Sequence, residues 1–332
     1  MIDSNGVTGK YDLAYEAGEA DEGVSVREIL RKRLSVSTRL LRRLKYGEEA
    51  GVCRNDVPVR MNERVAVGDA ITVRFPAEES GFAPEPIPIR VVYEDGDLLV
   101  IDKQAGLVVH PTKGHPAHTI ANGLMHRMEA CGERYKIRFV NRLDMDTTGL
   151  LVIGKNAYCQ EDFARQAAEN RVVKRYEAIV TGLVQADEGV IALPIGKAVE
   201  DELRRIVRAD GFPSETRYRV AERFACGRGY TRLALTLRTG RTHQIRVHLA
   251  HIGHAVVGDA LYGETSPLLT ERQALHASEL IFRHPRTKED LHLTAPLPGD
   301  MEKLLEKLRA TCDNTEGKTC APKDENEVGI TL

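Results

Sequence analysis

The stretch from Asn141 to Val152 constrains the fold of this chain more than any other, because a polar loop runs directly into an apolar segment. It reads Asn-Arg-Leu-Asp-Met-Asp-Thr-Thr-Gly-Leu-Leu-Val, so Arg142 and Asp144 stand two positions apart, with two hydroxyls and a glycine behind them. Such an order is typical of a tight loop ahead of a buried strand. We therefore predict a loop that presents Asp144 and is anchored by the strand after it. Taken alone, the pattern also fits a turn in which Asp144 caps local backbone amides.

The distribution of charge indicates a polyanionic partner, although the formal net charge of the 332 residues is only −2. The segment from Arg27 to Lys45 holds eight cations and one acid, and residues 204–246 are also rich in arginine. Acidic residues gather near the two ends of the chain. Because local patches set the field that a partner meets, the near-neutral total does not exclude RNA.

Cysteine usage and hydropathy place the chain in the reducing cytoplasm. The six cysteines are scattered without a Cys-x-x-Cys pair, which argues against a disulfide framework or a structural zinc. No apolar run approaches the ~18 residues of a membrane span, and the acidic N-terminus lacks the apolar core of a secretory signal. We expect a soluble, cytoplasmic protein with no membrane partner.

Changes of composition divide the chain into five parts. We expect a flexible acidic leader over 1–23, a compact module over 24–75, a proline-rich linker over 76–88, a larger domain over 89–308 and a disordered tail over 309–332. A chain of this length suggests about two domains.

The module over 24–75 consists of two basic helical patterns followed by alternating Val and Ile residues around Gly68-Asp69. This order resembles the S-four-like RNA-binding domain, which is a small α/β domain named after a ribosomal protein. A generic basic helical hairpin is the alternative. The cations expected to contact RNA are Arg31, Arg39, Arg42, Arg43 and Lys45.

The larger domain mixes strands and helices without a strand-helix-strand rhythm, which favours the α+β class. Helices are predicted over 119–130, 158–169 and 242–252, and strands over 89–93, 98–102, 174–180, 214–220 and 231–237.

Two further motifs lie on predicted elements. In Lys174-Arg175-Tyr176, the first and third side chains share one strand face, so Tyr176 either packs in the core or offers its ring and phenol to a ligand. In Gly240-Arg-Thr-His-Gln-Ile-Arg-Val-His248, a buried helical stripe contains Ile245, and the adjacent Arg246 points from the core edge. The Arg246 side chain either enters a cleft or lies on the surface and binds a phosphate.

These three motifs, in this order, resemble the RluA family of RNA pseudouridine synthases. The resemblance implies a catalytic core with a mixed, mainly antiparallel sheet flanked by helices and loops. It makes Asp144 the nucleophile, Tyr176 a stacking partner and proton relay, and Arg246 the ion-pair partner of Asp144. Arg142 would fill the place of a flipped uridine, although it could instead pair with Asp146 or a phosphate. The resemblance adds Lys174, Thr147 and His243 as substrate-binding residues, and implies no cofactor and no metal.

Three residues depart from the family pattern. Gln104 stands where proline is usual, Asn141 where histidine is common, and Thr148 where serine is usual. Thr148 keeps the hydroxyl, whereas Asn141 removes an ionisable group. The nearby histidines do not suggest a metal site, because His248, His251 and His254 spread around the expected helix without an acidic or thiol ligand at helical spacing.

Isomerisation of specific uridines to pseudouridine, in large-subunit ribosomal RNA, is the function we predict, carried out by a monomer. A transfer-RNA pseudouridine synthase and a non-catalytic ribosome-associated RNA-binding protein are the alternatives. A histidine-based metal-dependent hydrolase is a third possibility, which a metal assay would test.

Overall fold

The computed structural model describes residues 12–46, 51–198, 203–264 and 270–316, and the chain forms two compact units. The first unit contains the residues up to 174 together with 277–295. The second contains 175–276 and the residues from 296 onwards. The predicted domain over 89–308 therefore contributes residues to both units.

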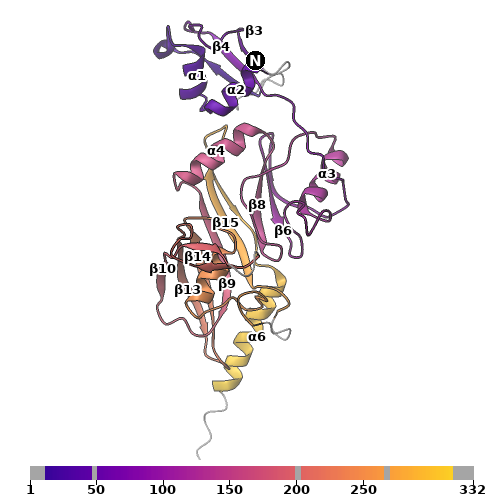
Figure 1. Cartoon of the computed structure of the whole chain (residues 1–332), viewed down its shortest axis with the longest axis vertical. Coiled ribbons are helices and arrows are strands. Elements are labelled where there is room, and N and C mark those ends of the chain that lie inside the picture. The colour runs from indigo at the N-terminus through magenta and orange to yellow at the C-terminus, as the bar shows by residue number, and fades with distance from the viewer. Residues whose placement is uncertain (1–11, 47–50, 199–202, 265–269, 317–332) are drawn as a thin grey trace, which may run out of the picture. The chain divides into compact units, whose positions relative to one another are not determined.

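The N-terminal module of the first unit packs two helices on a small sheet (Figure 1). The sheet order is β1-β4-β2-β3, and its pairings are antiparallel. Ser25 caps the first helix by accepting a hydrogen bond from the Glu28 amide. Helical periodicity buries Ile29, Leu30 and Leu40 against Ile71, which explains why this short segment is compact. The elements are α1 (Val26–Lys32), α2 (Thr38–Tyr46), β1 (Leu13–Glu16), β2 (Gly51–Arg54), β3 (Val57–Pro58) and β4 (Ala70–Arg74).

The predicted flexible leader needs correction from residue 12 onwards. Residues 13–16 form β1, which pairs with β4, and Leu13 is buried. A short 3-10 helix follows over Glu19–Asp21, and Asp21 accepts hydrogen bonds from the Tyr15 hydroxyl and Arg33. The sequence did not show this strand because its partner lies more than fifty residues away. Residues 1–11 lie outside the described part of the chain.

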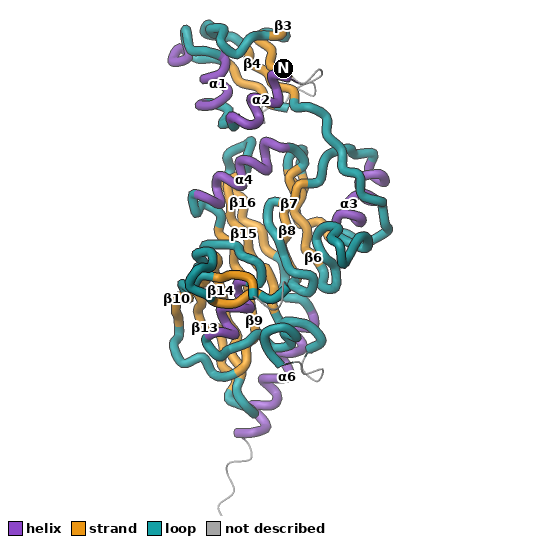
Figure 2. Tube along the Cα trace, in the orientation of Figure 1, coloured by secondary structure: helices purple, strands orange, loops and turns teal. Residues whose placement is uncertain are grey.

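The remainder of the first unit is a larger sheet with two helices (Figure 2). Its strand order is β15-β8-β6-β5, with β16 added to β15 and β7 added to β8. Thr119 and Asn156 cap the two helices, and both helices fall where the sequence predicted them. The elements are α3 (Ile120–Cys131), α4 (Ala157–Ala168), β5 (Arg90–Glu94), β6 (Leu98–Lys103), β7 (Arg138–Phe139), β8 (Thr148–Gly154), β15 (Leu275–Arg283) and β16 (Asp290–Thr294).

The second unit contains the strand order β10-β13-β14-β9, a separate hairpin and two helices. The predicted strands over 174–180, 214–220 and 231–237 and the helix over 242–252 are confirmed, with ends shifted by a few residues. Gly253, two residues after the end of this helix, has a positive φ of 84°. The elements are β9 (Val173–Thr181), β10 (Glu188–Ile191), β11 (Ile195–Lys197), β12 (Arg205–Val207), β13 (Thr216–Phe224), β14 (Tyr230–Leu237), α5 (Gln244–His251) and α6 (Gly299–Glu316).

The predicted disordered tail is wrong for residues 309–316, which continue α6. Leu304, Leu305 and Leu308 bury one face of this helix. Beyond them, Arg309 forms a bidentate pair with Glu222, with Nη2 2.6 Å from a carboxylate oxygen. The Arg309–Glu222 pair thus contributes to the part of α6 that follows Leu308. The composition of the sequence does not reveal this contact. Residues 317–332 lie outside the described part.

The mixture of sheets and helices places the protein in the predicted α+β class. None of the helices in the described ranges has the length and apolar character needed to cross a membrane.

Candidate active site

Asp144 lies in a turn immediately before β8, as the sequence predicted. The Thr147 amide donates to the Asp144 carbonyl at 3.1 Å, which closes the turn. The Asp144 side chain is half-buried and Arg142 is exposed, while Thr147 and Thr148 are buried. The loop therefore holds two half-buried carboxylates, Asp144 and Asp146, and is followed by the buried Thr147 and Thr148.

A buried lysine that sequence reasoning missed holds this loop. Lys103, at the end of β6, has no exposed surface. Its Nζ donates to the carbonyl oxygens of Gln104 at 2.9 Å, Met145 at 2.7 Å and Thr147 at 3.0 Å. Three donated bonds require three N–H groups, so the side chain is an ammonium ion. A lysine two residues after the apolar run 98–101 was the available signal.

Two other residues connect the loop to the sheet. Gly149 adopts φ of +108°, and a Cβ placed there would lie 2.2 Å from the Ala277 carbonyl oxygen, so only glycine fits. The Asn141 side chain donates to the Leu150 carbonyl at 3.1 Å and accepts from the Val152 amide at 2.7 Å. Asn141 therefore pairs with β8 as a neighbouring backbone would, which gives this departure from the family pattern a structural role.

Tyr176 lies on β9 in the second unit with 7% of its surface exposed. Arg175 is exposed and Ala178 is buried, so the predicted alternation of strand faces is confirmed. Lys174, which belongs to the first unit, is half-buried. Burial lowers the pKa of its ammonium group from the usual value.

Arg246 on α5 is held by Asp259, a second residue that the sequence did not identify. The guanidinium and carboxylate form a bidentate pair, with Nε–Oδ2 at 2.6 Å and Nη2–Oδ1 at 2.8 Å, and both groups are buried. Asp259 also accepts the amides of Leu261 and Tyr262, and the Tyr262 ring lies 5.1 Å from the guanidinium carbon. Asp144 and Arg246 belong to different units, and their pairing stays a prediction.

His243 is the residue before α5, and its φ of +56° is unusual for a residue other than glycine. Its Nδ1 lies 2.8 Å from the Tyr262 hydroxyl oxygen. The same hydroxyl accepts a hydrogen bond from the Arg205 amide at 2.8 Å. Tyr262 therefore connects the start of α5 with the β11–β12 hairpin, and the substrate-binding role of His243 stays a prediction.

The histidines of this region have structural contacts. His248 is fully buried, with Nε2 2.9 Å from the Leu193 carbonyl oxygen and Nδ1 2.9 Å from the Thr216 hydroxyl. Burial lowers the pKa of His248, which favours the neutral ring. His254 contacts the Thr181 carbonyl oxygen through Nδ1. Within the described ranges, no group of three or more His, Cys, Asp or Glu side chains could hold a metal ion.

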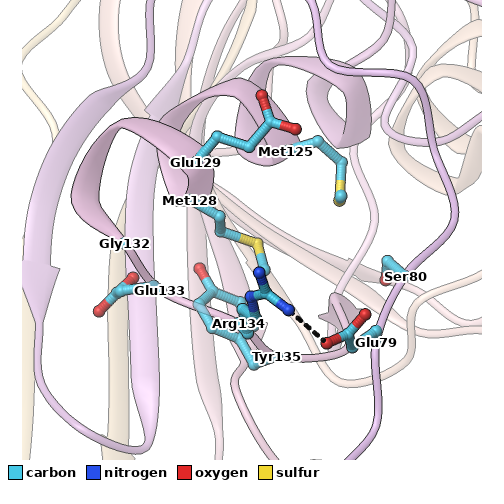
Figure 3. A pocket seen from close by; sticks show the side chains of 9 residues that line it. All are labelled: Glu79, Ser80, Met125, Met128, Glu129, Gly132, Glu133, Arg134 and Tyr135. Carbon is cyan, nitrogen blue, oxygen red and sulfur yellow. Dashed lines mark ion pairs between the residues drawn. The ribbon is translucent and has the colours of Figure 1, made fainter.

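A pocket of about 480 Å³ lies between the C-terminal end of α3 and residues 79–80 of the predicted linker (Figure 3). Its lining includes three glutamates and one arginine, and Glu79 pairs with Arg134 at 3.7 Å. The Tyr135 hydroxyl is inaccessible and makes no hydrogen bond within the described structure. None of the predicted site residues lines this pocket, and its excess of carboxylates does not suit a polyanion.

The predicted RNA-contacting cations of the N-terminal module differ in availability. Arg31, Arg39 and Arg42 are exposed. Arg43 is partly buried and pairs with Glu78 at 2.7 Å. Lys45 lies on α2, but its side chain is outside the described part of the structure. Three of the five cations are therefore exposed, and their contact with RNA stays a prediction.

Comparisons with known proteins agree with this architecture. The RNA pseudouridylate synthase family matches residues 97–251. The RNA pseudouridine synthase YlyB of Bacillus subtilis (strain 168) is 40% identical over 266 residues, covering 79% of this chain and 87% of the relative. The ribosomal large subunit pseudouridine synthase D of Haemophilus ducreyi is 39% identical over 264 residues, covering 75% and 80%. The structure of human RNA pseudouridylate synthase domain containing 1 aligns with a TM-score of 0.53 at 28% identity, covering 70% of this chain and 98% of that one.

The fold and these similarities define the class of protein: the chain belongs to the RNA pseudouridine synthase family. It is an isomerase that converts uridine in RNA to pseudouridine.

Proposed function

We propose that this protein isomerises one or more uridines of large-subunit ribosomal RNA, as a cytoplasmic monomer that uses Asp144 as its nucleophile. The observation that carries the choice of RNA is the similarity to proteins named ribosomal large subunit pseudouridine synthase D. Two of them are 39% and 43% identical and are covered over 80% and 67% of their length. The exposed arginines Arg31, Arg39 and Arg42 support a contact between the N-terminal module and a polyanion, in addition to the contact at the proposed active site.

The proposed chemistry needs a nucleophile and a means to rotate the base. The Asp144 carboxylate attacks the target nucleoside and forms a bond to it, and the bond between C1′ of the ribose and N1 of uracil breaks. The uracil then turns within the site, a bond forms between C1′ and C5, and the C5 hydrogen leaves as a proton while N1 gains one. The bond to Asp144 breaks again before the product leaves, which returns the free carboxylate. Substrate and product are isomers, so the reaction is balanced without a redox partner.

The surroundings of Asp144 support the assignment. The side chain is half-buried, and its loop is fixed by the buried Lys103 ammonium, which binds the loop carbonyls of Met145 and Thr147. A nucleophile on such a support needs little reorganisation when the base enters. In this proposal Arg246 orients the carboxylate, Tyr176 stacks on uracil and relays a proton, and Arg142 fills the vacated position in the RNA. Lys174, Thr147 and His243 contact the substrate.

The test uses RNA carrying tritium at C5 of uridine, because the isomerisation releases that hydrogen to water. We expect the purified protein to release tritium from a large-subunit ribosomal transcript. Carbodiimide mapping of ribosomal RNA from a strain that lacks the gene should show at least one lost pseudouridine. If large-subunit RNA stays fully modified and a transfer RNA loses a site, the substrate is wrong and the chemistry stands. If no RNA releases tritium, the assignment of function fails.

A further inference from the structure

Phe212 differs from every other described Phe and Tyr side chain in its exposure. Its relative exposure is 67%, whereas each of the other described aromatic side chains is half-buried or buried. The chain contains no tryptophan. An exposed phenyl ring carries an unfavourable hydration cost. A single ring of this kind in an enzyme that handles RNA therefore calls for an explanation.

The backbone around Phe212 is fixed although the ring is exposed. Its amide and carbonyl form a reciprocal pair of hydrogen bonds with Ile195 of β11, at 2.8 and 3.0 Å. Gly211 permits this approach, because a Cβ there would lie 2.6 Å from the Ile195 carbonyl carbon. Pro213 follows and restricts Phe212 to extended backbone. The ring is thus presented by a rigid segment.

An arginine guanidinium covers one side of the ring. The Arg241 Cζ atom lies 5.4 Å from the Phe212 ring centroid, and Arg241 Nε donates to the Pro213 carbonyl at 3.4 Å. The Arg241 amide is bound by the Gln244 side chain in the turn that starts α5. The same helix carries Arg246 further along. The aromatic group and helix α5 therefore belong to one connected structure within the second unit.

We propose that Phe212 and Arg241 form a stacking platform for an unpaired nucleobase of the RNA substrate. A planar, uncharged ring with a guanidinium beside it offers π-stacking and a cation in one place, which is the combination that binds single-stranded nucleic acid. The base is one that accompanies the target uridine on the same RNA. The proposal rests on RNA as the substrate and not on the choice of ribosomal RNA.

A base suits this platform better than a phosphate or a protein surface. Phosphate would be bound by the N–H donors of Arg241 alone, because a phenyl ring supplies none, and it would leave the exposed ring of Phe212 unexplained. A protein partner would be expected to use exposed apolar residues without a ring as well. Leu203, two residues before β12, has 76% exposure. Comparison of Phe212 with Leu203 therefore separates stacking from general apolar contact.

The kinetic test measures tritium release by the full-length protein from whichever labelled RNA the parent modifies, ribosomal or transfer. Stacking contributes ~1–3 kcal/mol per base. We therefore expect Phe212→Ala to raise KM about 10-fold, within a range of about 5- to 150-fold, with kcat within about twofold of the parent. Phe212→Trp should restore KM, and Leu203→Ala should leave it unchanged. An unaltered KM in Phe212→Ala would overturn the proposal, as would an equal loss in Leu203→Ala.

A spectroscopic test follows from the absence of tryptophan. Phe212→Trp supplies a single tryptophan, whose emission can be excited apart from that of the ten tyrosines, and stacking of a base on it should quench this emission as RNA is added. Val190→Trp, at another exposed position of the same unit, serves as the matched control and should respond weakly. If saturating RNA leaves the emission of the Phe212→Trp variant unchanged while that variant still modifies the RNA, no base occupies the platform. Far-ultraviolet circular dichroism checks that each variant is folded.

Discussion

The Asp144 loop and the Arg246 segment both carry groups that the proposed chemistry needs, but they are held in different ways. The loop is fixed through its backbone, because Lys103 binds two of its main-chain carbonyls, those of Met145 and Thr147. Arg246 is fixed through its side chain, by a bidentate pair with the buried Asp259. The Asp144 loop thus depends on the Lys103 ammonium, whereas Arg246 depends on the Asp259 carboxylate.

This difference determines which substitutions each region tolerates. Because Lys103 binds backbone oxygens of the loop, its hold does not depend on the Asp144 side chain. Asn141 and Asp146 differ from Asp144, since their side chains bind the backbone of β8 and the Gly106 amide. A side-chain pair fixes Arg246 only while both charges remain, since removal of one leaves the other buried without compensation. The nucleophile can therefore be altered with the fold intact, whereas the arginine cannot be separated from its partner.

The largest effect should come from Asp144→Asn, which isolates chemistry from structure. The amide has nearly the same shape but is not a nucleophile, so turnover should fall by at least about 10⁴-fold. Because the side chain is half-exposed, the free energy of unfolding should change by no more than ~0.5 kcal/mol. Single-turnover tritium release and thermal unfolding measure the two quantities. Asp146→Asn is the matched control, and activity of Asp144→Asn within tenfold of the parent would refute the assignment.

A smaller but structural effect is expected for Asp259→Asn. The substitution removes the buried charge opposite Arg246, and the loss of one partner of such a pair costs about 3–5 kcal/mol. Urea unfolding measures this loss, and activity should fall with it. Arg246→Lys should retain only part of the activity of the parent protein, because an ammonium cannot make the planar bidentate pair with Asp259. If Asp259→Asn proved as stable as the parent, the ion pair would not be what holds α5.

Lys103→Met should destabilise the first unit by about 3 kcal/mol, because three backbone carbonyls lose their shared donor. The loop that carries Asp144 should also loosen, so kcat should fall at temperatures where the variant is still folded. Urea unfolding and tritium release give both values. Lys113→Met changes an exposed lysine in the same unit and should match the parent. Parent-like stability in Lys103→Met would argue that the clamp is dispensable.

The smallest effect concerns pH. Burial lowers the pKa of His248 below its ordinary value of 6.5, so the unfolded chain binds a proton more readily than the folded one. The neutral His248 ring makes its full contribution to the free energy of unfolding above pH 6.5. As the pH falls below 6.5, this contribution decreases by up to ~1.4 kcal/mol per pH unit. The difference in unfolding free energy between the parent and His248→Gln, measured from pH 7.5 to 5.5, should narrow. A constant difference would contradict the prediction.

The sequence was informative where a local pattern determines structure. The Asp144 turn, helices α3 to α5 and the alternating faces of β9 follow from glycine and hydroxyl placement, capping residues and periodicity. These signals lie within a few residues of the element they predict.

Contacts between distant segments were not predictable in this way. Lys103 binds backbone carbonyls more than forty residues away, and a carbonyl has no residue identity to recognise. Strand β1 acquires its partner only through β4. Asp259 lies in a stretch that resembles the family, but its pairing with Arg246 depends on how the chain returns after α5. Asn141 shows the same limit, since its two bonds to β8 appear only in the folded state.

The tight fit of Gly149 against Ala277 has a consequence for biosynthesis. The ribosome makes the loop that carries Asp144 long before it makes the strand that this glycine accommodates. At ~5–20 residues per second, more than a hundred residues separate the two by roughly ten seconds. During that interval a nascent chain exposes one edge of an apolar strand, which is a hazard for aggregation. The first unit can close only after residues 175–276 of the second unit have been synthesised, so its sheet is completed late.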